Sequence, residues 1–304
     1  MTKQAIRLAH SPDPDDAFMF YGLASGAVDS GSFEFEHILR DIQTLNEWAR
    51  RSRLEVTAVS VHAYAYVKDS YAILRSGASM GATRLARYVP EDPNQHTSEL
   101  PTTEPGDTVA HGPLLIAAEP LSLSQLAGKT IAIPGEMTTA FLVLQLVLGH
   151  IDYRMMMFDE IPTAVQQRRV DAGLIIHEGQ LTYRRLGLHC VLDLGLWWFE
   201  QTRLPLPLGC NVIRRDLGDQ VMHEISNILT ASIEYGLAHR NKAVRYALQF
   251  GRGLDEQLAD EFIGMYVNEW TLDYGPVGRN AITELLRRGA DAQIIPPIET
   301  IDFI

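Results

Sequence analysis

The fold is decided by one segment near the start of the sequence, Ile6-Arg7-Leu8-Ala9-His10-Ser11-Pro12-Asp13-Pro14-Asp15-Asp16-Ala17-Phe18-Met19-Phe20. Ile6 to Ala9 predicts a short strand, Ser11 to Pro14 a proline-rich loop, and Ala17 to Ala24 a helix. Acidic residues are favoured where a helix begins, because they accept hydrogen bonds from N–H groups that lack a partner. The segment is therefore a strand–loop–helix unit, the building block of an α/β protein.

The same alternation continues beyond it. Residues 33–39 and 56–61 have the pattern of strands, and residues 42–50 and 63–67 have helical spacing. This order of strands and helices predicts a largely parallel sheet covered by helices.

A second series of elements follows. Strands are expected at 114–118 and 129–133, and a helix from Thr138 to about Leu148. Residues 170–178 form a buried apolar strand that carries His177 and Glu178 at its carboxyl end. Amphipathic helices fill most of the chain from Gln220 to about Arg288.

The order of elements indicates two α/β lobes, one inserted into the other. The chain crosses between them near residues 113 and 212, so we expect a larger discontinuous lobe of residues 1–112 and 213–304 and a smaller inserted lobe of residues 113–212. Residues 83–108 are rich in proline and polar side chains, which predicts a long irregular loop inserted in the larger lobe.

Composition narrows the class of partner. The 304 residues carry a formal net charge of -12, which argues against nucleic acid, because phosphate backbones require a basic surface. An anionic small molecule therefore needs a local site of backbone N–H groups or a few placed cations. We expect neither a signal peptide nor a membrane-spanning segment, because the sequence contains no apolar stretch of the required length. With two cysteines in no metal or redox spacing, Cys190 and Cys210, we expect a cytoplasmic protein, and its oligomeric state is left open.

Four segments are expected to meet in a cleft between the lobes. Ligands of open α/β sheets bind beyond the carboxyl ends of the strands. Residues 11–16, 57–60 and 177–178 have that position, and Thr138-Thr139 begin a helix.

Each candidate side chain has a structural alternative. His177 is suited to general base catalysis, but it could equally cap the end of its strand. Thr138 and Thr139 could cradle a carboxylate or simply cap their helix. Asp13, with its neighbours Asp15 and Asp16, could bind a metal or serve as acid and base, although helix capping is the simpler interpretation.

Other chemistries have less support in the sequence. Residues 197–199, Trp-Trp-Phe, could stack on an aromatic ligand or pack in the core. There is neither a glycine-rich phosphate loop nor a nucleophile elbow, so nucleotide-binding and serine-hydrolase classes are not indicated.

Several blocks resemble one known family. Residues 11–21 resemble the opening signature of the 1,4-dihydroxy-6-naphthoate synthase family, usually Ser-Pro-Cys-Pro-Asn-Asp-Thr-Phe. Residues 41–46, 173–183, 193–209 and 266–275 are similar to further blocks of that family. The resemblance spans nearly the whole chain.

The resemblance implies a periplasmic-binding-protein-like fold of type II, with two α/β lobes and a ligand cleft between them. It also implies a carbon–carbon lyase that converts cyclic dehypoxanthine futalosine to 1,4-dihydroxy-6-naphthoate in the futalosine pathway of menaquinone biosynthesis, without metal or organic cofactor. By the same analogy His177 is the proton acceptor. The substrate-binding residues are expected to be Ser11, Asp13, Asn46, Ala58, Val59, Ser60, Thr138 and Thr139.

The chain departs from the family pattern at three positions. Asp13 and Asp15 stand where the family has Cys and Asn, and Ala58 stands where it usually has Lys. These differences make the expected pocket less favourable for a carboxylate, so the exact substrate stays open.

Two other functions are compatible with the same fold. One is the sister enzyme chorismate dehydratase, whose characteristic opening differs from Ser11-Pro12-Asp13-Pro14. The other is a non-catalytic solute-binding protein or ligand sensor, which would bind tightly without turnover. A transporter component would require export, and we expect no export signal in this chain.

Overall fold

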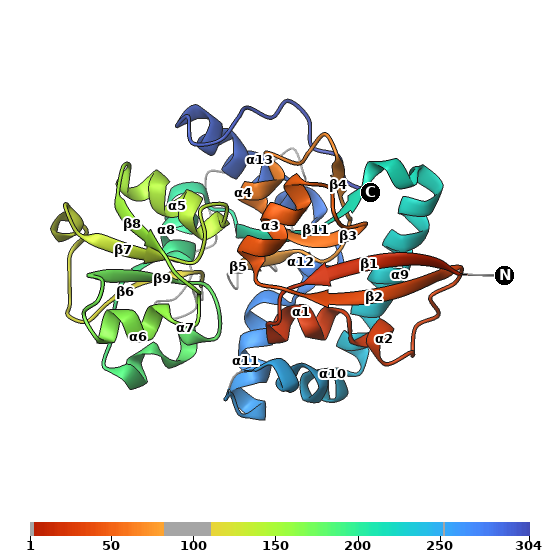
Figure 1. The fold of residues 1–304 in the computed structure, drawn as a ribbon, viewed down its shortest axis with the longest axis horizontal. Coiled ribbons are helices and arrows are strands. Elements are labelled where there is room, and N and C mark those ends of the chain that lie inside the picture. The colour runs from red at the N-terminus through yellow and green to blue at the C-terminus, as the bar shows by residue number, and fades with distance from the viewer. Residues whose placement is uncertain (1–2, 82–110, 252) are drawn as a thin grey trace.

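The computed structural model describes residues 3–81, 111–251 and 253–304. The expected insertion at 83–108 lies outside the described residues. Two sheets with their helices form two parts side by side, and both marked chain ends lie on the part built around the first sheet (Figure 1).

The first sheet is mixed. Its order is β2-β1-β3-β11-β4, with β5 also paired to β11. β1 pairs in parallel with β2 and β3, as expected, whereas β11 is antiparallel to β3, β4 and β5. The prediction of a largely parallel sheet is therefore right for one half only, because the returning strand β11 runs the other way. Its strands are β1 (Gln4–His10), β2 (Phe33–Leu39), β3 (Val56–Ser60), β4 (Tyr71–Ile73), β5 (Ser79–Gly81) and β11 (Leu206–Arg214).

The second sheet is also mixed, with the order β10-β6-β9-β7-β8. β7 is parallel to β8 and β9, and β6 is antiparallel to β9 and β10. Its strands are β6 (Leu114–Ala117), β7 (Thr130–Ile133), β8 (Asp152–Met155), β9 (Ala172–Ile175) and β10 (His189–Asp193).

Helices cover both sheets. Around the first sheet they are α1 (Pro14–Met19), α2 (Tyr21–Ala24), α3 (Ile42–Arg50), α4 (Val61–Tyr64), α9 (Asp219–Ala238), α10 (Arg240–Ala247), α11 (Glu256–Tyr266), α12 (Glu269–Leu272) and α13 (Gly275–Asp291). Around the second sheet they are α5 (Thr139–Leu148), α6 (Ile161–Gln166), α7 (Gly179–Thr182) and α8 (Leu194–Thr202). The helix expected at 17–24 is thus two short helices, which meet at Phe20.

The chain returns to the first sheet through β11. Gly209 to Ile213 pair with β3, so the expected boundary at residue 212 falls inside a strand of the first sheet. The segment before β6 touches the start of α8 backbone to backbone, because a Cβ atom at Gly195 would overlap the carbonyl of His111. Only glycine allows that approach.

The apolar core is shared between the two parts on one side of the molecule. A single cluster contains Val59 and Tyr64 from the first part together with Ile131, Leu142 and Trp198 from the second. Helix α5 packs against α4, α13 and β11. On this side the two lobes are therefore joined by buried apolar surface.

In the part of the chain that the structure describes, no helix combines the length and apolarity needed to cross a bilayer.

Candidate active site

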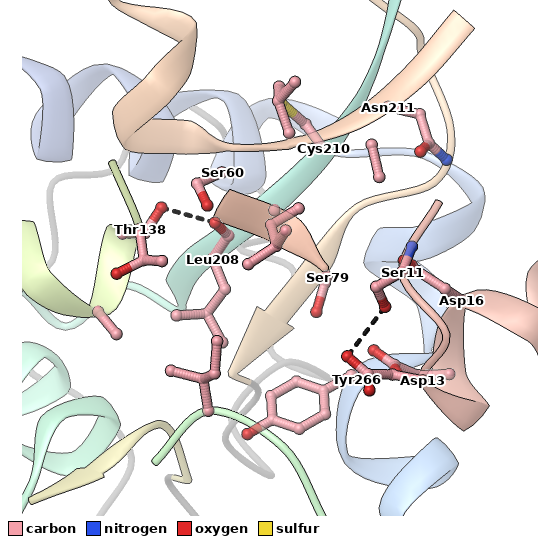
Figure 2. Close-up of a pocket in the computed structure, with 18 of the residues that line it drawn as sticks. Ser11, Asp13, Asp16, Ser60, Ser79, Thr138, Leu208, Cys210, Asn211 and Tyr266 are labelled. Carbon is pink, nitrogen blue, oxygen red and sulfur yellow. Dashed lines mark hydrogen bonds between the residues drawn. The ribbon is translucent and has the colours of Figure 1, made fainter. Parts of the chain in front are cut away.

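A cavity of about 100 Å³ lies where the two parts meet. Figure 2 shows its walls, with Ser11 and Asp16 on one side and Thr138 across from them. Its described lining residues are Ser11, Asp13, Asp15, Asp16, Ile42, Ala58, Val59, Ser60, Gly77, Ser79, Pro113, Thr138, Thr139, Ala140, Ile176, Leu208, Gly209, Cys210, Asn211 and Tyr266.

The loop after β1 supplies one wall. The Ser11 hydroxyl donates to Oδ2 of Asp13 at 2.9 Å, drawn dashed in Figure 2, and the Ser11 N–H donates to Oδ2 of Asp16 at 2.8 Å. Neither aspartate accepts the hydrogen bond that a helix cap would make, since α1 has no side-chain cap. The Asp13 side chain therefore does not cap α1, whereas the Asp15 carboxyl group accepts backbone hydrogen bonds within the first turn.

Burial changes the acidity of the carboxyl groups in this wall. It raises the pKa of Asp15 well above its ordinary value, and the charges of Asp16 and Asp13 raise it further. Burial also raises the pKa of Asp16 to about 6, with help from the charge of Asp13, although the hydrogen bonds from Ser11 oppose the shift. The wall thus carries fewer negative charges near neutral pH than its sequence indicates.

The end of β3 forms the floor of the cavity. Ala58, Val59 and Ser60 all line it, as predicted. Asn46 lies behind them and is fully buried. Its Oδ1 accepts the Ser60 N–H at 2.9 Å, and its Nδ2 donates to the Ser60 hydroxyl at 3.1 Å and to the Met137 carbonyl at 3.3 Å. Asn46 therefore positions the floor and does not itself line the cavity.

The start of α5 supplies the opposite wall. Thr138 is the helix cap, because its hydroxyl accepts the Phe141 N–H at 3.3 Å while donating to the Gly135 carbonyl at 2.8 Å. The Thr139 hydroxyl is also occupied, since it accepts the His62 N–H and donates to the Leu208 carbonyl. Within residues 3–81, 111–251 and 253–304 the backbone N–H groups of Thr139 and Ala140 have no acceptor. These N–H groups form the positive end of the helix dipole, which lies at the cavity, and they are therefore suited to bind an anion.

A further hydrogen bond joins the two parts beside the cavity. The Tyr266 hydroxyl, from α11, donates to Oε1 of Gln180, from α7, at 2.7 Å. Both side chains are buried. With the bonds of Asn46 and Thr139, it ties the lobes together around the cavity.

His177 lies close to this cavity but is not one of its described lining residues. The preceding residue, Ile176, does line it. His177 is 5% exposed, and its ring meets Phe158 edge to face at 4.9 Å between centroids. The absence of a side chain at Gly179 leaves room for the ring, because a Cβ there would lie 3.3 Å from Nε2.

Sequence patterns did not identify several lining residues. Ser79, Cys210, Asn211 and Tyr266 lie in the cavity wall. Of these, only Tyr266 belonged to a block that resembled the family, and nothing in its local pattern indicated a ligand contact. The other three depend on pairing between β11 and the distant strands β3 and β5.

The acidic side chains do not form a metal site. Across the described ranges, no group of three or more His, Cys, Asp or Glu is arranged to hold a metal ion.

Comparison with known proteins defines the class. A family model described as menaquinone biosynthesis matches residues 6–85 and 107–291. The alkanesulfonate-binding protein SsuA from Xanthomonas axonopodis pv. citri superposes with a TM-score of 0.66 at 10% identity, covering 98% of this chain and 96% of that one. A Candida albicans protein described as having the generic periplasmic binding protein fold has a TM-score of 0.66 at 11% identity, over 97% and 92% of the two chains. The molecule is therefore a periplasmic-binding-protein-like α/β protein, as the resemblance implied, although its two sheets are mixed and not largely parallel.

More similar proteins define the family. The 1,4-dihydroxy-6-naphthoate synthase of Thermus thermophilus is 38% identical over 282 residues, 93% of either chain. That of Streptomyces coelicolor is 33% identical over 98% of this chain and 97% of its own. A crystal structure from Archaeoglobus fulgidus has a TM-score of 0.82 at 42% identity, covering 95% and 97% of the two chains. The chain belongs to the 1,4-dihydroxy-6-naphthoate synthase family of menaquinone biosynthesis, a family of enzymes, which decides against a non-catalytic binding protein.

Proposed function

We propose that the protein cleaves cyclic dehypoxanthine futalosine to 1,4-dihydroxy-6-naphthoate in the cavity between its lobes, as a carbon–carbon lyase. The observation that carries the proposal is the similarity to two synthases over at least 93% of the chain. The cavity supports it, because Ser11, Asp13, residues 58–60, Thr138 and Thr139 come together there.

The chemistry requires a base and an oriented substrate. A carbon-bound proton must be removed, and formation of the aromatic product ring supplies much of the driving force. The protein's task is then to hold the substrate against a base in a site that excludes water. We assign the base to His177, because an imidazole is well suited to accept a proton near neutral pH.

The assignment of His177 requires a movement of the molecule. Its ring packs beside Phe158, while its neighbour Ile176 lines the cavity. The cavity of about 100 Å³ is also smaller than the ~300–1,000 Å³ typical of small-molecule sites. We infer that the lobes separate to admit substrate and that the segment 176–180 turns toward it as they close again.

The substrate's anionic group is best placed at the start of α5. The N–H groups of Thr139 and Ala140 lie at the positive end of that helix, within the cavity wall. The opposite wall contains Asp13, Asp15 and Asp16, which disfavour an anion whenever they are ionised. A carboxylate of the substrate is therefore expected on the side of Thr139.

Incubation with cyclic dehypoxanthine futalosine, followed by mass analysis for 1,4-dihydroxy-6-naphthoate, tests the proposal directly. We expect the naphthoate to form without added metal, and parallel incubation with chorismate to leave chorismate unchanged. Conversion of chorismate alone would assign the sister activity instead. No product from either compound would refute the proposed reaction.

A further inference from the structure

Asn211 is a cavity-lining residue whose side-chain amide makes no hydrogen bond to residues 3–81, 111–251 or 253–304. It lies in the middle of β11, is 2% exposed, and lines the cavity. Its backbone is fully used, because the carbonyl accepts the Leu74 N–H at 2.9 Å and β11 pairs with β3 at this position. Neither amide atom is among the described side-chain atoms that are both fully buried and without a partner, so the amide keeps contact with the cavity. With no protein partner, its donor and acceptor are available to a bound molecule.

Asn46 shows what a purely structural asparagine does in the same site. It is equally buried, and its side chain makes three hydrogen bonds, to the N–H and hydroxyl of Ser60 and to the carbonyl of Met137. Both ends of that amide are satisfied by protein atoms. The two asparagines therefore differ in whether protein atoms satisfy their amides.

The surrounding backbone is built around the Asn211 amide. Gly77 has φ +91°, a conformation that favours glycine, and a Cβ atom there would overlap Nδ2 of Asn211. The loop before β5 therefore closes on one side of the amide. The remaining side is the cavity, where Ser79 also contributes its hydroxyl.

We propose that Asn211 binds a neutral oxygen-bearing group of the substrate, a hydroxyl or a carbonyl, and so helps to select it. An amide offers a donor and an acceptor together, which suits a neutral group better than a charged one. Asp13, Asp15 and Asp16 line the same cavity and disfavour a second anion there whenever they are ionised. The inference rests on the proposed function for the identity of the substrate.

A comparison of Asn211→Leu with Asn46→Leu tests the structural part without any substrate. Removing the unpaired amide is expected to leave the melting temperature unchanged or to raise it, because no hydrogen bond is lost. Asn46→Leu is expected to lower it clearly, because three bonds are lost. An equal fall in both variants would overturn the inference, since Asn211 would then serve the fold.

Steady-state kinetics with cyclic dehypoxanthine futalosine test the ligand contact. We expect KM to rise about three- to tenfold in Asn211→Leu, the loss of one neutral hydrogen bond, with a smaller change in kcat. An unchanged KM in an active, folded variant would overturn the inference. Absence of turnover by the unsubstituted protein would instead refute the proposed function, and the melting temperatures would still decide the role of Asn211.

Discussion

The hydroxyl of Thr139 donates a 2.6 Å hydrogen bond to the carbonyl oxygen of Leu208, and it accepts the N–H of His62 at 3.2 Å. Thr139 begins α5, beside the second sheet, whereas Leu208 and His62 belong to β11 and α4 of the first part. One hydroxyl thus links both lobes at the edge of the cavity. It was predicted as a substrate contact, and in this structure it is engaged by the protein.

Thr139→Val should test that link. Loss of the hydroxyl leaves a buried carbonyl and a buried N–H without their partner, so we expect a loss of about 1–3 kcal/mol in the free energy of unfolding. KM should rise more than kcat falls, because the wall that receives the substrate is loosened. Thr139→Ser, which keeps the hydroxyl, is the control in denaturant titration and kinetics. A larger effect on kcat would place the hydroxyl in the transition state instead.

His177→Asn should abolish most turnover. The loss of a general base typically costs a factor of about 10²–10⁴ in rate. Folding should be largely retained, because asparagine keeps a polar group at the strand end. The exposed His150, replaced in the same way, is the matched control and should keep full activity. Normal turnover in His177→Asn would remove this residue from the mechanism.

Asp15→Asn should change how stability depends on pH. A carboxyl group whose pKa is raised on folding favours the folded state below its unfolded pKa of ~3.9, and this advantage disappears as the pH rises through the folded value. Because burial raises the pKa of Asp15, and that of Asp16 to about 6, we expect stability to fall as the pH rises from about 4 through 6.

The variant removes one of these groups with little change in shape. It should therefore be more stable than the unsubstituted protein at pH 8, and the difference should shrink at pH 4. Denaturant titration at both values measures this, with the exposed Asp152→Asn as control. Equal pH profiles for Asp15→Asn and the unsubstituted protein would contradict the expectation.

Glu55→Gln should change the pH dependence of stability in the direction opposite to Asp15→Asn. Glu55 receives hydrogen bonds from the Arg7 side chain at 2.7 and 2.8 Å, and Arg214 lies 3.2 Å away. Burial alone would raise its pKa, but the bonds and charge of Arg7 and the charge of Arg214 together lower it. Its contribution to stability is therefore present above the unfolded pKa of ~4.3 and is lost as the pH falls through the lowered value.

At pH 7 the Glu55 substitution should cost on the order of 1–3 kcal/mol, because a largely buried carboxylate loses its ion pairs. The cost should decrease in acid. Glu34→Gln, at an exposed position in β2, is the control. A cost that is the same at pH 3 and pH 7 would show that packing, and not charge, is responsible.

Local patterns predicted the elements well and the return strand poorly. The strand at 33–39 and the helix at 42–50 were predicted with the observed bounds, and Thr138 caps its helix as one of its two predicted roles. The crossing between the lobes was expected near residue 212, whereas β11 already begins at Leu206. Its start depends on pairing with β3 and β5, which lie far away in sequence.

The candidate site was predicted in the same uneven way. Ser11, Asp13, residues 58–60 and the two threonines line the cavity because strand ends and helix starts gather at one edge. The burial of His177 beside Phe158 could not be inferred, since Phe158 lies outside the strand that carries the histidine. The partnerless amide of Asn211 likewise depends on the loop around Gly77.

The closed cavity also affects the turnover rate of the enzyme. A chamber held shut by Tyr266 with Gln180, by Asn46 with Met137 and by Thr139 with Leu208 has to come apart once for every molecule that leaves it. Product release is then expected to limit turnover. Raising the solvent viscosity should therefore lower kcat at saturating substrate without changing the rate of the bond-breaking step.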